Sequence, residues 1–201
     1  MKSLKKVLIT VGIILAVIFI IYSFFAGTYN SIVAKDEEIN SQWAQVQNQY
    51  QRRLDLIPNL VSTVKGYASH ESELLTAVTE ARSRAGGLVK IDAEALEDPE
   101  TFKKYQQVQD SLSSSLQRLL AVTESYPELK ANENFLELQS QIEGTENRIA
   151  VERKRYNDAA KEYNIYIRQF PKSIIANMNG FRAKSYFEAS AEAQSAPKVE
   201  F

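Results

Sequence analysis

The chain has 201 residues, with 24 lysines and arginines against 25 acidic residues, and it contains no cysteine. The absence of cysteine excludes disulfide bonds, thiolate catalysis and cysteine-ligated metal sites. The near-neutral charge, without a basic patch interleaved with aromatic residues, argues against nucleic-acid binding, and the low glycine and proline content favours helix throughout.

The first predicted element is a transmembrane helix over residues 7–26, preceded by a short basic N-terminus over residues 1–6. Its sequence, VLITVGIILAVIFIIYSFFA, is uncharged and almost wholly apolar. At helical rise it spans about 30 Å, which matches the hydrocarbon core of a bilayer. The alternative is a cleaved signal peptide, but cleavage after Ala26 would place Phe24 at a position that requires a small residue. We therefore predict a retained, single-pass signal anchor.

The orientation of this anchor follows from the charges on either side of it. Lys2, Lys5 and Lys6 precede the apolar segment, whereas Lys35 is followed at once by three acidic residues. The positive-inside rule places the short N-terminus in the cytoplasm. The bundle that follows the anchor is then predicted to lie on the extracytoplasmic side of the cell membrane.

Three long helices are predicted after the anchor, over about residues 29–84, 99–126 and 132–169. In each, apolar residues recur at intervals of three and four, which indicates a stripe that packs against other helices; in the third, the steps alternate as in a coiled coil. Short connections make sequential helices antiparallel neighbours.

We therefore expect an all-α fold, in which an N-terminal single transmembrane helix is followed by an elongated antiparallel bundle of three long helices. This bundle takes up residues 27–189, with Pro58 bending its first helix and an apolar C-terminal segment wrapped against it. The small and polar residues 190–201 are expected to form a disordered tail.

Charged residues interrupt the apolar stripes of the first and third helices. We predict that these residues, with two neighbours at the proline, form a polar cluster across the helix interface: Arg52, Arg53, Asp55, Pro58, Asn59, Glu146, Glu152 and Arg153. An unpaired charge inside such an interface is strongly destabilising, so the arginines and carboxylates should pair. Two interpretations stay open, namely a layer that only fixes the alignment of the helices and a functional site.

A second pattern on the third helix repeats a tyrosine–asparagine pair after one heptad, at Tyr156, Asn157, Tyr163 and Asn164. The spacing places both pairs on one face. Core packing, with the tyrosines hydrogen-bonded to neighbours, is one interpretation. A partner-binding surface is the other.

Residues suited to catalysis are scarce. His70 is the only histidine, and Leu74 stands where a zinc-protease motif would require a second one. The serines at positions 113–115 have no base indicated by the pattern, and we find no glycine-rich phosphate loop or calcium loop. We therefore predict no enzymatic activity, no catalytic or metal-binding residues and no cofactor.

Several of these segments together resemble one family. They are RRLDLIPNLVSTVKGYASHE at 52–71, EAR at 80–82, YPELKAN at 126–132, ENRI at 146–149, the two YN pairs, FP at 170–171 and YFEA at 186–189. In this order they resemble the LemA family of bacterial membrane-anchored helical proteins. The resemblance implies the architecture described above and a link to membrane biogenesis, which some relatives have, but no established biochemical activity.

We therefore expect a membrane-anchored helical scaffold or interaction protein of the bacterial envelope, whose helix faces contact a protein partner or a second copy of the chain. The alternative is an extracytoplasmic ligand-binding or sensor bundle with its site near Pro58.

Overall fold

The computed structural model describes residues 2–88 and 93–189, and all regular structure in this part of the chain is helical. The predicted all-α class is confirmed. The tail predicted over 190–201 lies outside the described residues. The elements in chain order are α1 (Lys2–Tyr67), α2 (Ser72–Gly86), η1 (Ala93–Leu96), α3 (Pro99–Val122), η2 (Thr123–Ser125), α4 (Pro127–Lys130), α5 (Glu133–Arg168) and α6 (Lys172–Met178).

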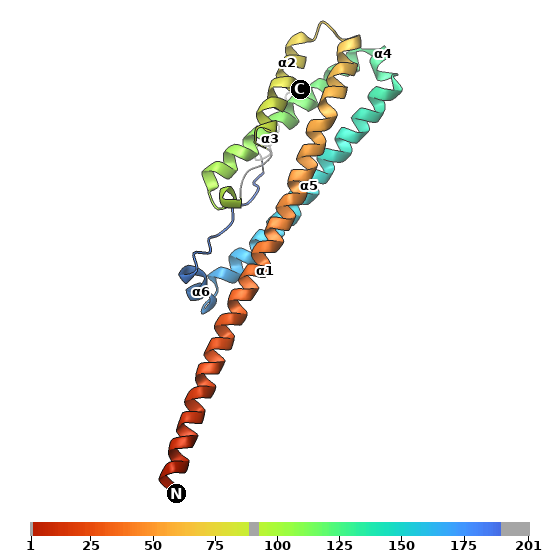
Figure 1. Ribbon diagram of the computed structural model, residues 1–201. Helices are drawn as coiled ribbons and strands as arrows, with labels where there is room; N and C mark the ends of the chain where they lie inside the picture. Colours follow the sequence, from red (N-terminus) through yellow and green to blue (C-terminus); the bar gives the residue numbers. More distant parts are fainter. Residues whose placement is uncertain (1, 89–92, 190–201) are drawn as a thin grey trace, which may run out of the picture.

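One helix, α1, forms both the apolar N-terminal segment and a side of the bundle. Its first part projects from the bundle alone, and its later part runs beside α5 (Figure 1). The large apolar side chains between Leu4 and Phe25 are all exposed, whereas Thr28 and Ile32 are buried. The helix continues without a break through Gly27. The apolar segment is therefore a continuous helical extension of the bundle.

The first bundle helix, predicted over residues 29–84, is two helices in the structure. Helix α1 ends at Tyr67, the chain reverses, and α2 begins at Ser72 and packs between α1 and α3. Side chains from the far end of the bundle hold this reversal, because the Tyr126 hydroxyl donates to Glu71 and the Asn132 amide donates to the Tyr67 hydroxyl. The periodic pattern did not indicate the break after Tyr67, because α1 and α2 bury their apolar faces in the same core.

The other two predicted bundle helices correspond to α3 and α5, and a side chain caps the first turn of each. The Asp98 side chain accepts a hydrogen bond from the Glu100 amide at 3.2 Å, and the Asn132 side chain accepts one from the Phe135 amide at 3.0 Å. Such caps satisfy amides that have no partner inside the helix. Helix α3 ends at Val122, four residues before the predicted end at 126, because the chain tightens there into η2.

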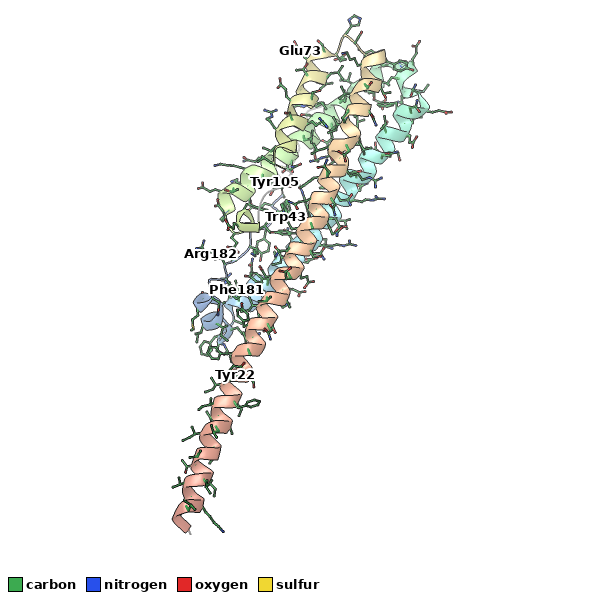
Figure 2. The ribbon with its side chains drawn as sticks, viewed as in Figure 1. Tyr22, Trp43, Glu73, Tyr105, Phe181 and Arg182 are labelled. Atoms are coloured by element: carbon green, nitrogen blue, oxygen red, sulfur yellow. The ribbon has the colours of Figure 1, made fainter. Side chains whose placement is uncertain are left out.

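The bundle contains two apolar cores, one after the other along its length. The core nearer the N-terminal segment is aromatic, and Figure 2 shows Trp43 and Tyr105 in it. Between ring centroids, Trp43 lies 5.3 Å from Tyr105, 5.6 Å from Tyr156 and 6.0 Å from Phe187. The core at the far end is mainly aliphatic and includes Leu54, Leu60, Val64, Leu112, Leu116, Leu119, Phe135 and Ile142. Helices α1, α3 and α5 contribute to both.

Pro58 lies inside α1 and explains how α2 is attached. Proline has no amide hydrogen, so the carbonyl of Leu54, four residues earlier, loses its donor within the helix. Arg82 on α2 supplies the missing donor, because its Nε donates to the Leu54 carbonyl oxygen at 3.0 Å. The proline thus creates an acceptor in α1 that Arg82 uses to fix α2 against it.

This arrangement predicts that the effects of changes at Arg82 and Pro58 are coupled. Arg82→Met should lower the free energy of unfolding by about 1–3 kcal/mol, because the Leu54 carbonyl loses its donor. In a Pro58→Ala background the loss should shrink, because alanine brings back the backbone amide that bonds to the Leu54 carbonyl within the helix. The fluorescence of Trp43, the chain's one tryptophan, reports urea unfolding of the full chain in detergent.

Arg84→Met is the matched control, since Arg84 is exposed on the same helix and its loss should change stability by less than about 0.5 kcal/mol. An equal loss for Arg82→Met in both backgrounds would contradict the coupling.

Candidate functional site

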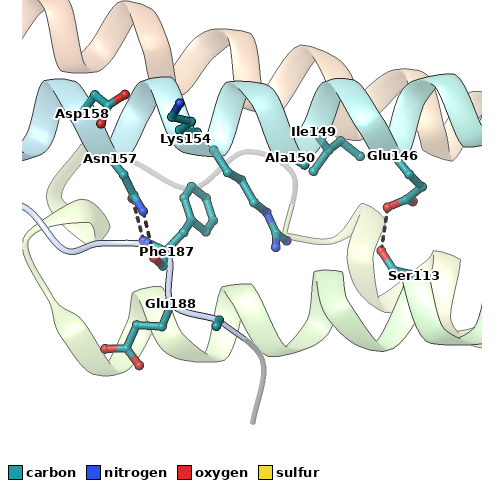
Figure 3. A pocket seen from close by; sticks show the side chains of 11 residues that line it. Ser113, Glu146, Ile149, Ala150, Lys154, Asn157, Asp158, Phe187 and Glu188 are labelled. Atoms are coloured by element: carbon teal, nitrogen blue, oxygen red, sulfur yellow. Dashed lines mark hydrogen bonds between the residues drawn. The ribbon is translucent and has the colours of Figure 1, made fainter. Parts of the chain in front are cut away.

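Arg53 lies between the two apolar cores with a fully buried side chain. Its Nη1 donates to the Glu146 carboxylate at 2.9 Å and to the Ser113 hydroxyl at 2.7 Å, and its Nη2 donates to the Gln109 side-chain oxygen at 2.5 Å. Ser113 in turn donates to the other oxygen of Glu146 at 3.0 Å (Figure 3). One arginine from α1 is thus bound to α3 and to α5 in a single layer.

A second arginine extends this layer. Arg153 on α5 donates from Nε to the Tyr50 hydroxyl at 2.7 Å and from Nη2 to Asp110 on α3 at 2.9 Å. The Tyr50 ring lies beside both guanidinium groups, 5.1 Å from that of Arg53 and 5.5 Å from that of Arg153. With Glu146 and Asp110 opposite them, the two arginines form a charge-balanced network, which we call the arginine layer.

The titration of the buried groups agrees with this description. Burial raises the pKa of Tyr50, and the nearby Arg153 and Arg53 offset only part of that effect, so the phenol stays protonated at neutral pH. Burial alone would lower the pKa of Arg153, but Tyr50 and Asp110 outweigh it, and the net pKa is raised. Within the layer, Arg153 is therefore charged and Tyr50 neutral at neutral pH.

The arginine layer couples three helices through charged and polar side chains. Ser113 donates to the Glu146 carboxylate and accepts from Arg53, so its hydroxyl links two charged groups. Among the described residues, no group of three histidine or acidic side chains is placed to hold a metal ion. What the geometry provides is a fixed alignment of three helices.

The structure brings together three of the eight residues predicted for the polar cluster, namely Arg53, Glu146 and Arg153. Pro58 acts one turn further on through Arg82. The remaining four face elsewhere: Arg52 and Asn59 are exposed, Asp55 accepts from Gln51 at 2.8 Å, and Glu152 pairs with Arg155 at 2.8 Å within α5.

Sequence reasoning missed the contribution of α3 to this layer. Gln109, Asp110 and Ser113 supply three of its partners, and Gln106 lies on the same side of the helix. A signal was present, because these four polar residues recur at steps of three and one, the spacing of one helix face. The more regular apolar stripe of the same helix indicated only the face that packs in the core.

The tyrosine–asparagine pairs bind the protein's own C-terminal segment, residues 181–188. The Asn164 side chain accepts from the Lys184 amide at 2.8 Å and donates to the Lys184 carbonyl at 2.9 Å. Asn157 binds the amide and the carbonyl of Phe187 in the same way, both at 2.9 Å (Figure 3). Gln106 on α3 repeats the pattern with the backbone of Glu188.

The spacing of these contacts has a geometric cause. Seven residues of helix and three residues of extended chain both cover about 10 Å. Asn157 and Asn164 therefore meet Phe187 and Lys184 in register. Together with Gln106 they form an amide ladder, which binds backbone groups as a neighbouring strand would.

The tyrosines of the same repeat are buried beneath this segment. Tyr156 and Tyr163 have no exposed surface, and the Tyr156 hydroxyl donates to the Ser185 carbonyl at 3.1 Å. Burial raises the pKa of both phenols. The face predicted as a possible partner surface is thus covered by residues 181–188 of the chain itself.

Lys184 adds a second buried charge that the sequence did not reveal. Its side chain is almost completely buried, and its Nζ lies 2.9 Å from Asp36 on α1 and 2.7 Å from Glu97 after η1. Burial lowers the pKa of Lys184, but hydrogen bonds to Glu97 and Asp36 outweigh it, so the net pKa is raised. No helical periodicity points to this residue, because it belongs to an extended segment.

An open pocket of about 500 Å³ lies where residues 187–189 pass between α3 and α5 (Figure 3). Its wall carries charges of both signs and includes Ser113, Glu146, Arg153, Lys154, Asp158 and Glu188. The pocket borders the arginine layer, whose residues Glu146 and Arg153 form part of it.

These features define a class of protein: an all-α, elongated bundle whose first helix continues into one exposed apolar segment. A sequence profile of the LemA family matches residues 42–201. The chain belongs to the LemA family, which confirms the resemblance seen in the sequence.

Curated relatives agree with this assignment. Magnetosome proteins MamQ 1 and MamQ 2 of Paramagnetospirillum magneticum are each 26% identical to it over 80% of this chain and 64% of their own length. Protein LemA of Metamycoplasma hominis is 25% identical over 85% of this chain and 74% of its own. The chain thus covers just under two thirds of the MamQ proteins.

Loss of Glu146 should destabilise the fold, because Arg53 is buried and needs a carboxylate partner. Glu146→Ala is expected to lower the free energy of unfolding by about 2–4 kcal/mol, because Arg53 stays buried without its carboxylate. The lower end allows for the 32% exposure of the Glu146 side chain. Replacing both partners, as Arg53→Met with Glu146→Leu, should recover most of this loss. Urea unfolding followed by Trp43 fluorescence measures both.

Glu143→Ala serves as the control, because Glu143 is an exposed residue of the same helix and should matter by less than about 0.5 kcal/mol. A Glu146→Ala variant as stable as this control would contradict the role of the arginine layer.

The amide ladder predicts a local effect of Asn164→Asp. A carboxylate still accepts from the Lys184 amide but cannot donate to the Lys184 carbonyl, so the segment should open more readily. Amide hydrogen exchange of residues 184–187 is expected to quicken by about tenfold or more, as the loss of a buried hydrogen bond implies. Asn147→Asp, at an exposed site on α5, should leave this exchange unchanged.

Proposed function

We propose that this protein is a membrane-anchored helical scaffold of the bacterial envelope, which holds a stiff bundle at the membrane surface for contact with other proteins. The observation that carries the proposal is the unbroken course of α1 from an exposed apolar segment into the bundle core. This is the one helix of the described chain that is long and apolar enough to cross a bilayer. Its apolar side chains have no protein surface to pack against, and lipid would bury them.

The construction of the bundle supports a scaffold rather than an enzyme. The arginine layer holds α1, α3 and α5 in one alignment, so a load on the bundle is passed directly to the membrane helix. The relatives named as magnetosome proteins agree with a part in membrane organisation or assembly. In this proposal the partner is another protein, or a second copy of the chain, bound through the exposed helix faces.

We place the bundle on the outer side of the cell membrane. The support is the charge distribution, since Lys2, Lys5 and Lys6 precede the apolar segment and acidic residues follow it.

A second candidate function is the recognition of a small ligand by a sensor bundle. The pocket of about 500 Å³ beside the arginine layer favours it, because charged groups of both signs line a cavity of ligand size. A ligand for this pocket would raise the melting temperature of the full chain without changing its oligomeric state. Association that grows with protein concentration would instead favour the scaffold.

Membrane fractionation tests the anchor on which the scaffold depends. The full chain should stay in the membrane fraction through alkaline carbonate extraction, whereas Ile14→Arg with Ile18→Arg should release it. Two arginines at the bilayer centre oppose insertion by about 5–7 kcal/mol together.

Leu136→Arg with Val151→Arg is the matched control, because both residues are exposed apolar side chains of the bundle. It should fractionate like the unchanged protein. Recovery of the unchanged chain in the carbonate extract would argue against a spanning helix.

A further inference from the structure

The two most exposed large apolar side chains of the described residues lie at one end of the bundle. Phe170, in the turn between α5 and α6, is 81% exposed, and Met178, the last residue of α6, is 74% exposed. Ile174 on α6 is 48% exposed, whereas its neighbours Ile175 and Ala176 are buried against the bundle. Helix α6 therefore packs with one apolar face and turns a second apolar face outward.

This end of the bundle is the end next to the apolar N-terminal segment. Helix α6 contacts α1, and the ring of Phe181, just after α6, lies 5.8 Å from that of Tyr29 on α1. Figure 2 shows Phe181 a short way along α1 from Tyr22, which belongs to the apolar segment. Figure 1 likewise places α6 where the lone part of α1 enters the bundle.

The helical rise gives the height of this contact above the hydrocarbon core. If residues 7–26 fill the core, Tyr29 lies about 4.5 Å beyond its edge, since α1 is unbroken there. The headgroup layer on each side is about 5–7 Å thick. The contact between Tyr29 and Phe181 therefore lies within the headgroups, and α6 with it.

The charges at this end suit an anionic lipid surface. Residues 163–187 contain no aspartate or glutamate, but they include Arg168, Lys172 and Arg182. On α1 the first acidic residue after the apolar segment is Asp36. Arg168 and Arg182 are exposed, and the Nζ of Lys172 lies over the ring of Tyr166 at 3.8 Å. Basic side chains beside apolar ones are the pattern of a segment that lies in a membrane interface.

We propose that the turn between α5 and α6, with the outer face of α6, inserts into the headgroup layer of a bilayer that contains anionic phospholipid. This inference rests on the proposed function, because it requires residues 7–26 to span the membrane. The bundle then has two points of attachment, which limit its tilt relative to the membrane. A fixed tilt determines which helix faces point away from the membrane toward a partner.

Single cysteines can report the depth of this surface, because the natural chain has none. We would label Ile174→Cys, Leu136→Cys and Ile18→Cys with a polarity-sensitive fluorophore in the full chain. Each variant is placed in vesicles of phosphatidylethanolamine and phosphatidylglycerol. Ile174 and Leu136 are a matched pair, since both are 48% exposed aliphatic residues at opposite ends of the bundle. Lipids carrying a quencher at the headgroup or in the acyl chain then measure the depth of each label.

We expect the headgroup quencher to reduce fluorescence from position 174 by about threefold or more relative to position 136. Position 18 should respond to the acyl-chain quencher. If position 174 behaves like position 136 while position 18 is quenched, this inference is overturned and the anchor stands. If position 18 is not quenched either, both the insertion of α6 and the membrane anchor are overturned.

A third result would assign the surface to another occupant. Blue-shifted fluorescence at position 174 without quenching by lipid would mean that protein covers α6. Lipid insertion would then be overturned in favour of a partner or a second copy.

Discussion

The burial of Arg53 is the constraint on which the alignment of the bundle depends. A guanidinium group taken out of water needs new hydrogen-bond partners, and both terminal nitrogens of Arg53 find them in Gln109 and Ser113 on α3 and in Glu146 on α5. The apolar cores on either side have no such directionality, because hydrophobic contact tolerates sliding. A slip of one helical turn would separate the charges, so the arginine layer makes one alignment much more stable than its neighbours.

The aromatic core depends on a segment that lies far away in sequence. Phe187 packs against Trp43, Phe102 and Tyr156, and the backbone around it is held by the amide ladder. Lys184 ties the same segment to two further elements through Asp36 and Glu97. The C-terminal segment is thus a structural part of the bundle, and its residues 187 and 188 are bound by side chains of both α3 and α5.

The continuity of α1 connects these features to the membrane. Its apolar segment, its share of the aromatic core and Arg53 all lie on one helix without a hinge. Any partner that contacts the bundle therefore acts on an object whose orientation is coupled to the spanning segment that we propose. In the scaffold role that we propose, this coupling gives the bundle a defined orientation at the membrane.

The sequence by itself determined that the fold is helical, which faces of the predicted helices are apolar, and that the first helix is apolar enough to span a membrane. It also indicated that Arg53 needs a carboxylate, because burial and charge are local properties of a pattern. Only the tertiary structure decided that the chain reverses after Tyr67, that Glu146 rather than Glu152 meets Arg53, and that Asn157 and Asn164 bind residues 184–187. Periodicity tells which side of a helix is buried but carries no information about what lies opposite, and pairing across helices depends on that.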